Sequence, residues 1–114
     1  MKVHYLEIVT DDVDAACAIY AGAHSVSFGE ADPSLGGART AALADGGLVG
    51  VRAPMHEGEK AVTRAYLLVD DIQKAVDAAA AAGAQIMVPP MELPGHGQCA
   101  IYFQGGIEAG LWQT

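Results

Sequence analysis

Apolar and polar positions form the same pattern twice along the chain. In the first half, the alternating run VHYLEIV (3–9) predicts a strand, and the alanine-rich segment after the Asp-Asp pair at 11–12 predicts a helix. In the second half, the run RAYLLV (64–69), the Asp-Asp pair at 70–71 and another alanine-rich segment repeat that order. Internal repeats constrain the whole architecture, so this duplication is the starting point.

Each half continues in the same way after its helix. HSVSF (24–28) and QIMV (85–88) predict a strand, and GEADPSLGG (29–37) and PPMELPGHG (89–97) predict long loops. A two-stranded hairpin then follows, in which ADGG in one half and FQGG in the other supply the glycines of a tight turn.

These elements predict an α+β fold of two βαβββ modules. Module one covers 1–54, module two covers 61–114, and the polar segment MHEGEK (55–60) is the expected linker. We expect an eight-stranded cupped mixed sheet with the helices on the outside.

The helix ends carry recognisable signals. Thr10 or Asp11 is suited to cap the first helix, and Asp70 or Asp71 the second, because short polar side chains satisfy the first backbone N–H groups. Gly83 is suited to the C-terminal end of the second helix.

Strand alternation assigns the faces of the sheet. Leu6, Ile8, Leu67 and Val69 should lie under the helices, because an apolar face must be covered. The opposite, concave face should then carry Tyr5, Glu7, Arg64 and Tyr66.

Composition and charge narrow the classes of partner. Apolar residues make up 52% of the 114 positions, which is enough for a packed core. The net charge of −8 disfavours nucleic acid and anionic membranes, and no apolar run approaches the roughly 20 residues that span a bilayer. The N-terminus predicts a strand and not a signal peptide. We expect a cytoplasmic protein with Cys17 and Cys99 reduced and partly buried.

The doubled module resembles the vicinal oxygen chelate superfamily, which includes glyoxalase I, bleomycin-resistance proteins and extradiol dioxygenases. The resemblance rests on VTDDVDAACAIY, LVDDIQKAVDAAAAAGA and the ending PPMELPGHGQCAIYFQGGIEAGLWQ, and it covers nearly the whole chain. The ending is similar to a subgroup of glyoxalase-like bacterial proteins that finish in GLWQ. The fold hosts many chemistries, so the resemblance implies a fold and a pocket more than an activity.

The resemblance also implies where a divalent metal would bind. Metal-using members place one ligand on the first strand and one on the last strand of each module. With the aspartate pairs as anchors, these positions fall on Tyr5, Arg52, Arg64 and Trp112. None is an ordinary ligand of a divalent cation, and arginine has no accessible lone pair. We therefore expect no metal or other cofactor, and Trp112 should form a wall of the cup.

Two histidines remain as alternatives. A one-residue slip in register would turn His4 inward as a ligand, whereas a histidine near a strand start is commonly structural. His96 lies in the loop expected to overhang the cup, where it is a candidate acid, base or ligand contact.

The arginines suggest an anion site. Arg39, Arg52 and Arg64 all fall in predicted strands, and Glu7 is the acidic residue that alternation places inside. Glu7 should contact an arginine or a tyrosine hydroxyl, because buried charges need partners. The other arginines either bind a ligand or belong to a salt-bridge network or a dimer rim. The expected ligand-binding residues are Tyr5, Arg52, Arg64, Tyr66, Gln98, Tyr102, Trp112 and His96.

Two functional hypotheses follow. The first is a homodimeric protein that binds a small anionic or aromatic molecule without metal, as bleomycin-resistance proteins bind drugs. The second is a glyoxalase- or isomerase-like enzyme in which Glu7 is the general base or a metal ligand. An interaction domain with no small ligand is a third, plainer alternative.

Overall fold

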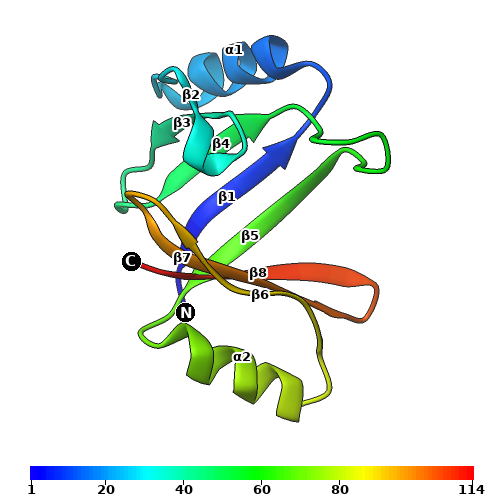
Figure 1. Cartoon of the computed structure of the whole chain (residues 1–114). Coiled ribbons are helices and arrows are strands. Elements are labelled where there is room, and N and C mark those ends of the chain that lie inside the picture. The colour runs from blue at the N-terminus through cyan, green and yellow to red at the C-terminus, as the bar shows by residue number, and fades with distance from the viewer. The chain divides into compact units, whose positions relative to one another are not determined.

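The computed structural model describes all 114 residues and contains eight strands and two α-helices (Figure 1). In chain order the elements are β1 (Val3–Val9), α1 (Val13–His24), β2 (Ala31–Asp32), the 3-10 helix η1 (Pro33–Leu35), β3 (Ala38–Ala42), β4 (Leu48–Arg52), β5 (Val62–Leu68), α2 (Ile72–Ala81), β6 (Gln85–Leu93), β7 (Gly97–Gln104) and β8 (Ile107–Gln113). The βαβββ order occurs twice, and the strands pair both parallel and antiparallel. The predicted α+β class with mixed strand pairing is confirmed.

The chain divides into two compact units. One unit is Tyr5–Thr63, with strand order β2-β3-β4-β1, and the other is Met1–His4 together with Arg64–Thr114, with strand order β5-β8-β7-β6. In each unit the first strand of the repeat runs parallel to the last strand, β1 to β4 and β5 to β8. The exact module boundaries at 54 and 61 stay a prediction.

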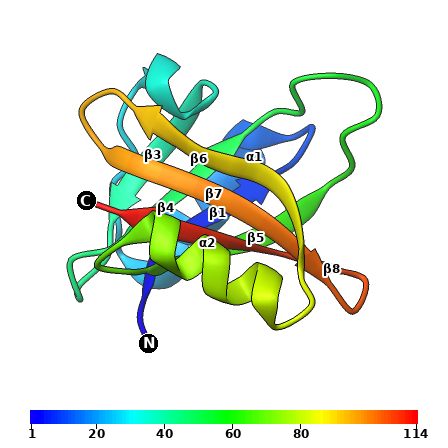
Figure 2. The same ribbon diagram turned by 60° about the horizontal axis from the view of Figure 1, so that its bottom comes forward.

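Each helix covers one face of its own strands. In the first unit, Leu6 and Ile8 of β1 pack with Cys17 of α1 and with apolar residues of β3 and β4. In the second unit, α2 contacts β6, β7 and β8 and lies along them in Figure 2. Val69 packs there with Ile72 of α2. Three of the four expected helix-facing positions, Leu6, Ile8 and Val69, are thereby confirmed, whereas Leu67 belongs to neither cluster.

The helix caps follow the aspartate pairs, with one shift. The Asp71 side chain accepts a hydrogen bond from the Lys74 N–H and caps α2, and Gly83 follows the helix at φ +109°, as expected. The cap of α1 is Asp12 and not Thr10 or Asp11. Thr10 instead accepts from the Asp12 N–H at 3.2 Å, so it fixes the approach to the cap.

The predicted strand at 24–28 is absent. His24 still belongs to α1, Ser25 ends the helix at φ 55°, and the next strand is only Ala31–Asp32. Val26 and Phe28 nevertheless pack against the core of the first unit. The alternating apolar residues indicated burial correctly, but burial alone does not require strand pairing.

The predicted loop at 89–97 is largely a strand. β6 continues to Leu93, and its pairing with β7 shifts between Ile86 and Val88 and again between Val88 and Met91. Pro89 and Pro90 lie within the second shift, and β6 is an edge strand of its unit. An edge strand tolerates prolines because one side of its backbone needs no ladder partner, so the proline pair did not end the strand.

The predicted tight turn of the last hairpin is confirmed. Gly105 and Gly106 both have positive φ and form the two-residue turn between β7 and β8. Cys17 and Cys99 are buried and form no disulfide. Neither helix has the length and apolar character to cross a membrane.

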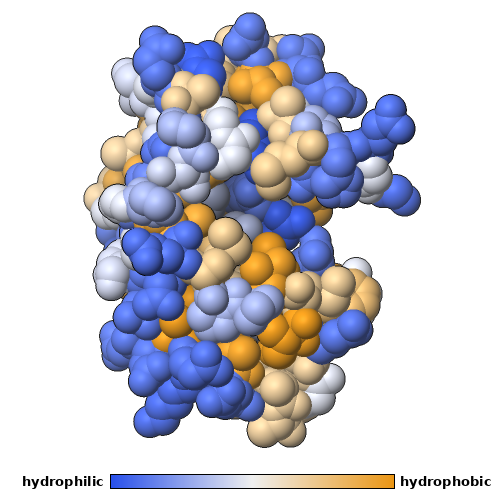
Figure 3. Space-filling model, viewed as in Figure 1, coloured by the Kyte–Doolittle hydropathy of each residue, from blue (hydrophilic) through white to orange (hydrophobic).

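Exposed apolar side chains are concentrated on the β6–β8 strands of the second unit. Met87, Met91, Phe103 and Ile107 are all at least one third exposed. Figure 3 shows apolar surface over the part of the molecule that contains these strands. Single exposed apolar residues are ordinary, whereas a group of them is typical of a contact surface.

Candidate functional site

The last strands of the two units place Arg52 and Trp112 in equivalent positions. Arg52 of β4 pairs with Val9 of the parallel strand β1, and Trp112 of β8 pairs with Leu68 of the parallel strand β5. The alignment of the two halves on their aspartate pairs therefore matches the strand register of the structure.

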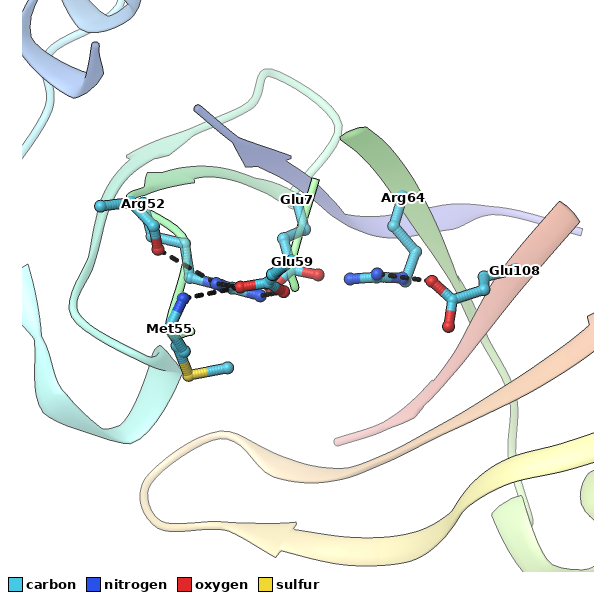
Figure 4. A network of polar contacts seen from close by, with 7 residues as sticks. Glu7, Arg52, Met55, Glu59, Arg64 and Glu108 are labelled. Carbon is cyan, nitrogen blue, oxygen red and sulfur yellow. Dashed lines mark hydrogen bonds and ion pairs between the residues drawn. The ribbon is translucent and has the colours of Figure 1, made fainter. Parts of the chain in front are cut away.

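The Arg52 guanidinium binds two carboxylates in the first unit (Figure 4). Its Nε donates to Glu7 Oε2 at 2.9 Å. Its Nη1 and Nη2 donate to the two oxygens of Glu59, each at 2.7 Å, which is the bidentate geometry that a carboxylate prefers. Nη1 also donates to the carbonyl of Ala53 at 3.1 Å. The expectation that Glu7 contacts an arginine is confirmed.

Charge pairing decides the ionisation of this cluster. The hydrogen bonds from Arg52 are the largest cause that lowers the pKa of Glu59 to about 2, and the N–H of Met55 adds to it. Glu59, then Glu7, raise the pKa of Arg52 against the opposing effect of burial. Burial, and then the charge of Glu7, raise the pKa of the Tyr5 hydroxyl. Arg52, Glu59 and Tyr5 therefore keep their usual charge states across the neutral range.

The segment that carries Glu59 follows β4 directly. Glu59 Oε1 also accepts from the N–H of Met55 at 2.7 Å, and the Glu59 N–H donates to the His56 carbonyl at 3.1 Å. A Cβ on Gly36 would lie 3.2 Å from both Arg52 Cδ and Met55 Sδ, so the loop after η1 packs closely on the arginine side chain. The predicted linker is thus a turn closed around one carboxylate.

Arg64 is the buried arginine of the second unit. Its Nη2 donates to Glu108 Oε1 at 2.7 Å, as the second contact in Figure 4 shows. The Arg64 side chain is 8% exposed, whereas that of Glu108 is 36% exposed. The pair therefore joins a buried cation to a carboxylate that solvent reaches.

Trp112 lies at the centre of an aromatic cluster in the second unit. Its ring centroid is 5.4 Å from that of His4, 5.8 Å from that of Tyr66 and 6.3 Å from that of His96. The indole Nε1 donates to the His96 carbonyl at 3.1 Å. The ring is buried, with 1% of Trp112 exposed, so it is a packed element and not an open wall.

Gln98 and Tyr102 differ from the expected placement. Both were expected among the ligand-binding residues with Trp112, but Tyr102 packs with the α2-facing cluster, and alternation places Gln98 on the same side. The strand partner of Gln98 is Gln113, whose Oε1 accepts from the Ile72 N–H on α2. Arg39, the third strand arginine, lies toward α1, and its Nη1 is 3.4 Å from Asp14 Oδ1.

Sequence comparison finds distant relatives that are named as glyoxylases. No protein-family model matches it. It is 28% identical over 117 residues to CFP32, a candidate glyoxylase by name, from Mycobacterium tuberculosis (strain CDC 1551 / Oshkosh) and from Mycobacterium bovis (strain ATCC BAA-935 / AF2122/97). The match covers 97% of this chain and 45% of CFP32, so the chain spans about half the length of these relatives.

Solved structures share the fold across nearly the whole chain. The hypothetical protein BH1468 from Bacillus halodurans C-125 superposes with a TM-score of 0.75 at 15% identity, over 99% of this chain and 94% of that one. A variant of Streptomyces coelicolor methylmalonyl-CoA epimerase in complex with 2-nitronate-propionyl-CoA gives 0.72 at 14% identity, over 100% and 97%. The chain has the vicinal oxygen chelate fold. The fold that the resemblance implied is thereby confirmed, while membership of the GLWQ subgroup stays a prediction.

The vicinal oxygen chelate fold implies a metal position that these residues do not fit. The four positions carry Tyr5, Arg52, Arg64 and Trp112, and both guanidinium groups are engaged with carboxylates. The indole nitrogen is a donor only. No three His, Cys, Asp or Glu side chains form a group that could hold a metal ion.

Three residues of the site were not predicted. Glu59 and Glu108 neutralise the buried arginines, and Gly50 leaves the space that the Tyr5 ring fills. The signal for the two glutamates was present, because two strand arginines in an acidic chain require more than the single carboxylate of Glu7. Which glutamates would meet them depended on the paths of the chain after β4 and at the start of β8.

Proposed function

We propose that this protein binds a small anionic or aromatic molecule without a metal ion, as a glyoxalase- and bleomycin-resistance-like binding protein. The observation that carries the proposal is the residue set at the four positions where metal-using relatives place ligands. Two of them are buried guanidinium groups, which donate hydrogen bonds and attract anions but coordinate no cation.

Arg64 is the proposed anion contact. Its present partner, Glu108, belongs to a strand end and is 36% exposed, so a ligand carboxylate can replace it at the same guanidinium. Tyr66 is two residues from Arg64 on β5, and its ring lies 5.8 Å from that of Trp112. This arrangement supports a ligand that combines an anionic group with an apolar ring. His96, beside Trp112, is a further proposed contact.

The single tryptophan gives the proposal a direct test. Protein treated with EDTA is titrated with benzoate, a small aromatic anion, while the emission of Trp112 is recorded. We expect saturable quenching or a spectral shift with benzoate and a much weaker response with benzyl alcohol, which lacks the charge. Arg64→Gln should weaken benzoate binding by about tenfold or more, since a charged hydrogen bond contributes roughly 1.5–3 kcal/mol.

The matched control is Arg39→Gln. Arg39 is also a strand arginine with an acidic partner, but it faces α1 and its side chain is 35% exposed. This variant should bind benzoate as the wild type does. If wild-type protein binds no member of a series of small carboxylates and aromatic acids, the proposed binding function is wrong.

An enzyme of glyoxalase or isomerase type is the second candidate. The names of CFP32 and of the methylmalonyl-CoA epimerase favour it. Glu7 would then act as the general base. The ion pair between Glu7 Oε2 and Arg52 Nε argues for a structural role instead. A lyase or isomerase activity that Glu7→Gln abolishes, while the variant keeps its circular dichroism and melting temperature, would establish the enzyme.

A homodimer is also proposed. The exposed apolar residues of β6–β8 and the unpaired edge of β6 support association with a second copy. Light scattering coupled to size exclusion would give a mass near twice 11.7 kDa. A mass of one chain at micromolar concentration would contradict this proposal.

A further inference from the structure

The two carboxylates on Arg52 hold it from different parts of the chain. Glu7 lies within β1, its side chain is 9% exposed, and it binds Nε. Glu59 lies outside any helix or strand, and it binds the Nη1 and Nη2 edge of the same guanidinium. Glu7 therefore orients the arginine from the sheet, while Glu59 covers its terminal edge.

Few contacts hold the segment 53–60 in place. The described hydrogen bonds are those from Arg52 and Met55 to Glu59, the turn from Glu59 to His56, and the Arg52 bond to Ala53. Most of the segment is exposed, and Met55 is 64% exposed. A segment with little buried apolar surface opens at a low cost in free energy. The hydrogen bonds of the Glu59 carboxylate are therefore the main contacts that hold residues 53–60 in place.

The Glu59 contact also has the geometry of a bound ligand. Both carboxylate oxygens accept from a two-pronged guanidinium edge at 2.7 Å, which is how a free carboxylate would bind there. Exchange of Glu59 for another carboxylate keeps the number of charges on Arg52 constant. No proton has to move, because Glu59 is ionised both when bound and when released at neutral pH.

We infer that the Nη1 and Nη2 edge of Arg52 is a carboxylate-binding site whose resident occupant is Glu59, and that a ligand carboxylate binds there by displacing Glu59 and freeing residues 53–60. This inference rests on the proposed binding function and extends it to a second anion contact. Glu59 would then compete with the ligand carboxylate for Arg52. The apparent affinity of a carboxylate is reduced by the fraction of molecules in which Glu59 occupies Arg52.

The test compares Glu59→Gln with Glu57→Gln. Glu57 belongs to the same exposed segment and has no described contact with Arg52, so it matches the charge change without touching the site. Isothermal titration with benzoate should give a dissociation constant lower by about tenfold for Glu59→Gln, as removal of the competitor predicts, and within about twofold of wild type for Glu57→Gln. Benzyl alcohol should show no such gain.

A second measurement uses the wild type, so it does not depend on how the variant folds. Hydrogen–deuterium exchange of peptides covering 53–60 should speed up when benzoate is added, because Met55 N–H loses its acceptor. It should already be fast in Glu59→Gln. Peptides from α2 serve as the internal control and should not change.

The outcomes separate this inference from the proposed function. If wild type binds benzoate and Arg64→Gln weakens binding, but Glu59→Gln binds no more tightly, the Arg52 site is wrong and the binding function stands. Unchanged exchange at 53–60 in the benzoate complex leads to the same conclusion. If Glu59→Gln tightens binding equally in the Arg64→Gln background, the Arg52 site stands and the role of Arg64 is wrong. Failure of benzoate to bind even Glu59→Gln overturns the Arg52 site.

Discussion

At the scale of single residues, one glycine in each unit makes room for a buried tyrosine ring. A Cβ on Gly50 would overlap the ring of Tyr5, and a Cβ on Gly110 would overlap the ring of Tyr66. The two glycines occupy β4 and β8, the last strands of their units. Each lets a tyrosine ring lie flat across the neighbouring strand, where a side chain would otherwise stand.

Gly50→Ala is therefore expected to destabilise the protein. The added methyl group must displace the buried Tyr5 ring, and overpacking of this kind costs about 1–3 kcal/mol of unfolding free energy. Gly22→Ala in α1 is the control, because nothing lies within 4 Å of its Cβ position, and it should stabilise by about 0.5–1 kcal/mol. Urea denaturation measures both. Equal stabilities would show that Tyr5 is not packed on Gly50.

The Glu59–Arg52 pair predicts a defined pH dependence. The pKa of Glu59 is depressed from 4.5 to about 2, so the pair contributes stability above pH 4.5 and loses it as the pH falls toward 2. The difference in unfolding free energy between wild type and Glu59→Gln should be about 1–3 kcal/mol at pH 7 and should shrink between pH 4.5 and pH 2. A difference that is independent of pH across this window would contradict the ion pair.

At the scale of elements, the sequence predicted helices and strands correctly where the hydrophobic periodicity agreed with capping residues or turn glycines at the ends. β1, both helices, both hairpins and the helix-facing residues Leu6, Ile8 and Val69 could be derived from alternation, the aspartate pairs and paired glycines. The missing strand at 24–28 and the longer β6 could not, because strand pairing depends on neighbours that are distant in the chain. Gln98 and Tyr102 were misplaced for a related reason, since each one-residue step along a strand changes the face.

The α2 cap offers a prediction at this scale. Asp71→Ala removes the acceptor of the Lys74 N–H and should lower the unfolding free energy by about 1 kcal/mol, through loss of the helix N-cap. Asp70→Ala changes the adjacent aspartate, which is not the capping residue, and should have a much smaller effect. Chemical denaturation of both variants decides this. If Asp70 proves the more costly position, the assignment of the cap is wrong.

At the scale of the whole molecule, the repeat was sufficient for the fold but not for the chemistry. The duplicated pattern led to the vicinal oxygen chelate fold, which the structural comparisons support over nearly the entire chain. The positions of Arg52 and Trp112 followed from the same alignment. The carboxylates that pair with Arg52 and Arg64 could not be derived in this way. Glu59 lies in a turn and Glu108 near a strand end, and the repeat does not determine the paths of these segments.

The central claim is that this member of the fold operates without a metal ion, with guanidinium groups where metal ligands would stand. The most direct measurement is elemental mass spectrometry of the purified protein, before and after incubation with nickel, zinc, manganese and iron(II) and subsequent desalting. We predict far less than one metal ion per chain in every sample, and benzoate binding that EDTA leaves unchanged. Retention of about one divalent ion per chain or per dimer would contradict the claim, and Glu7, His4 and His96 would then be the first ligands to test.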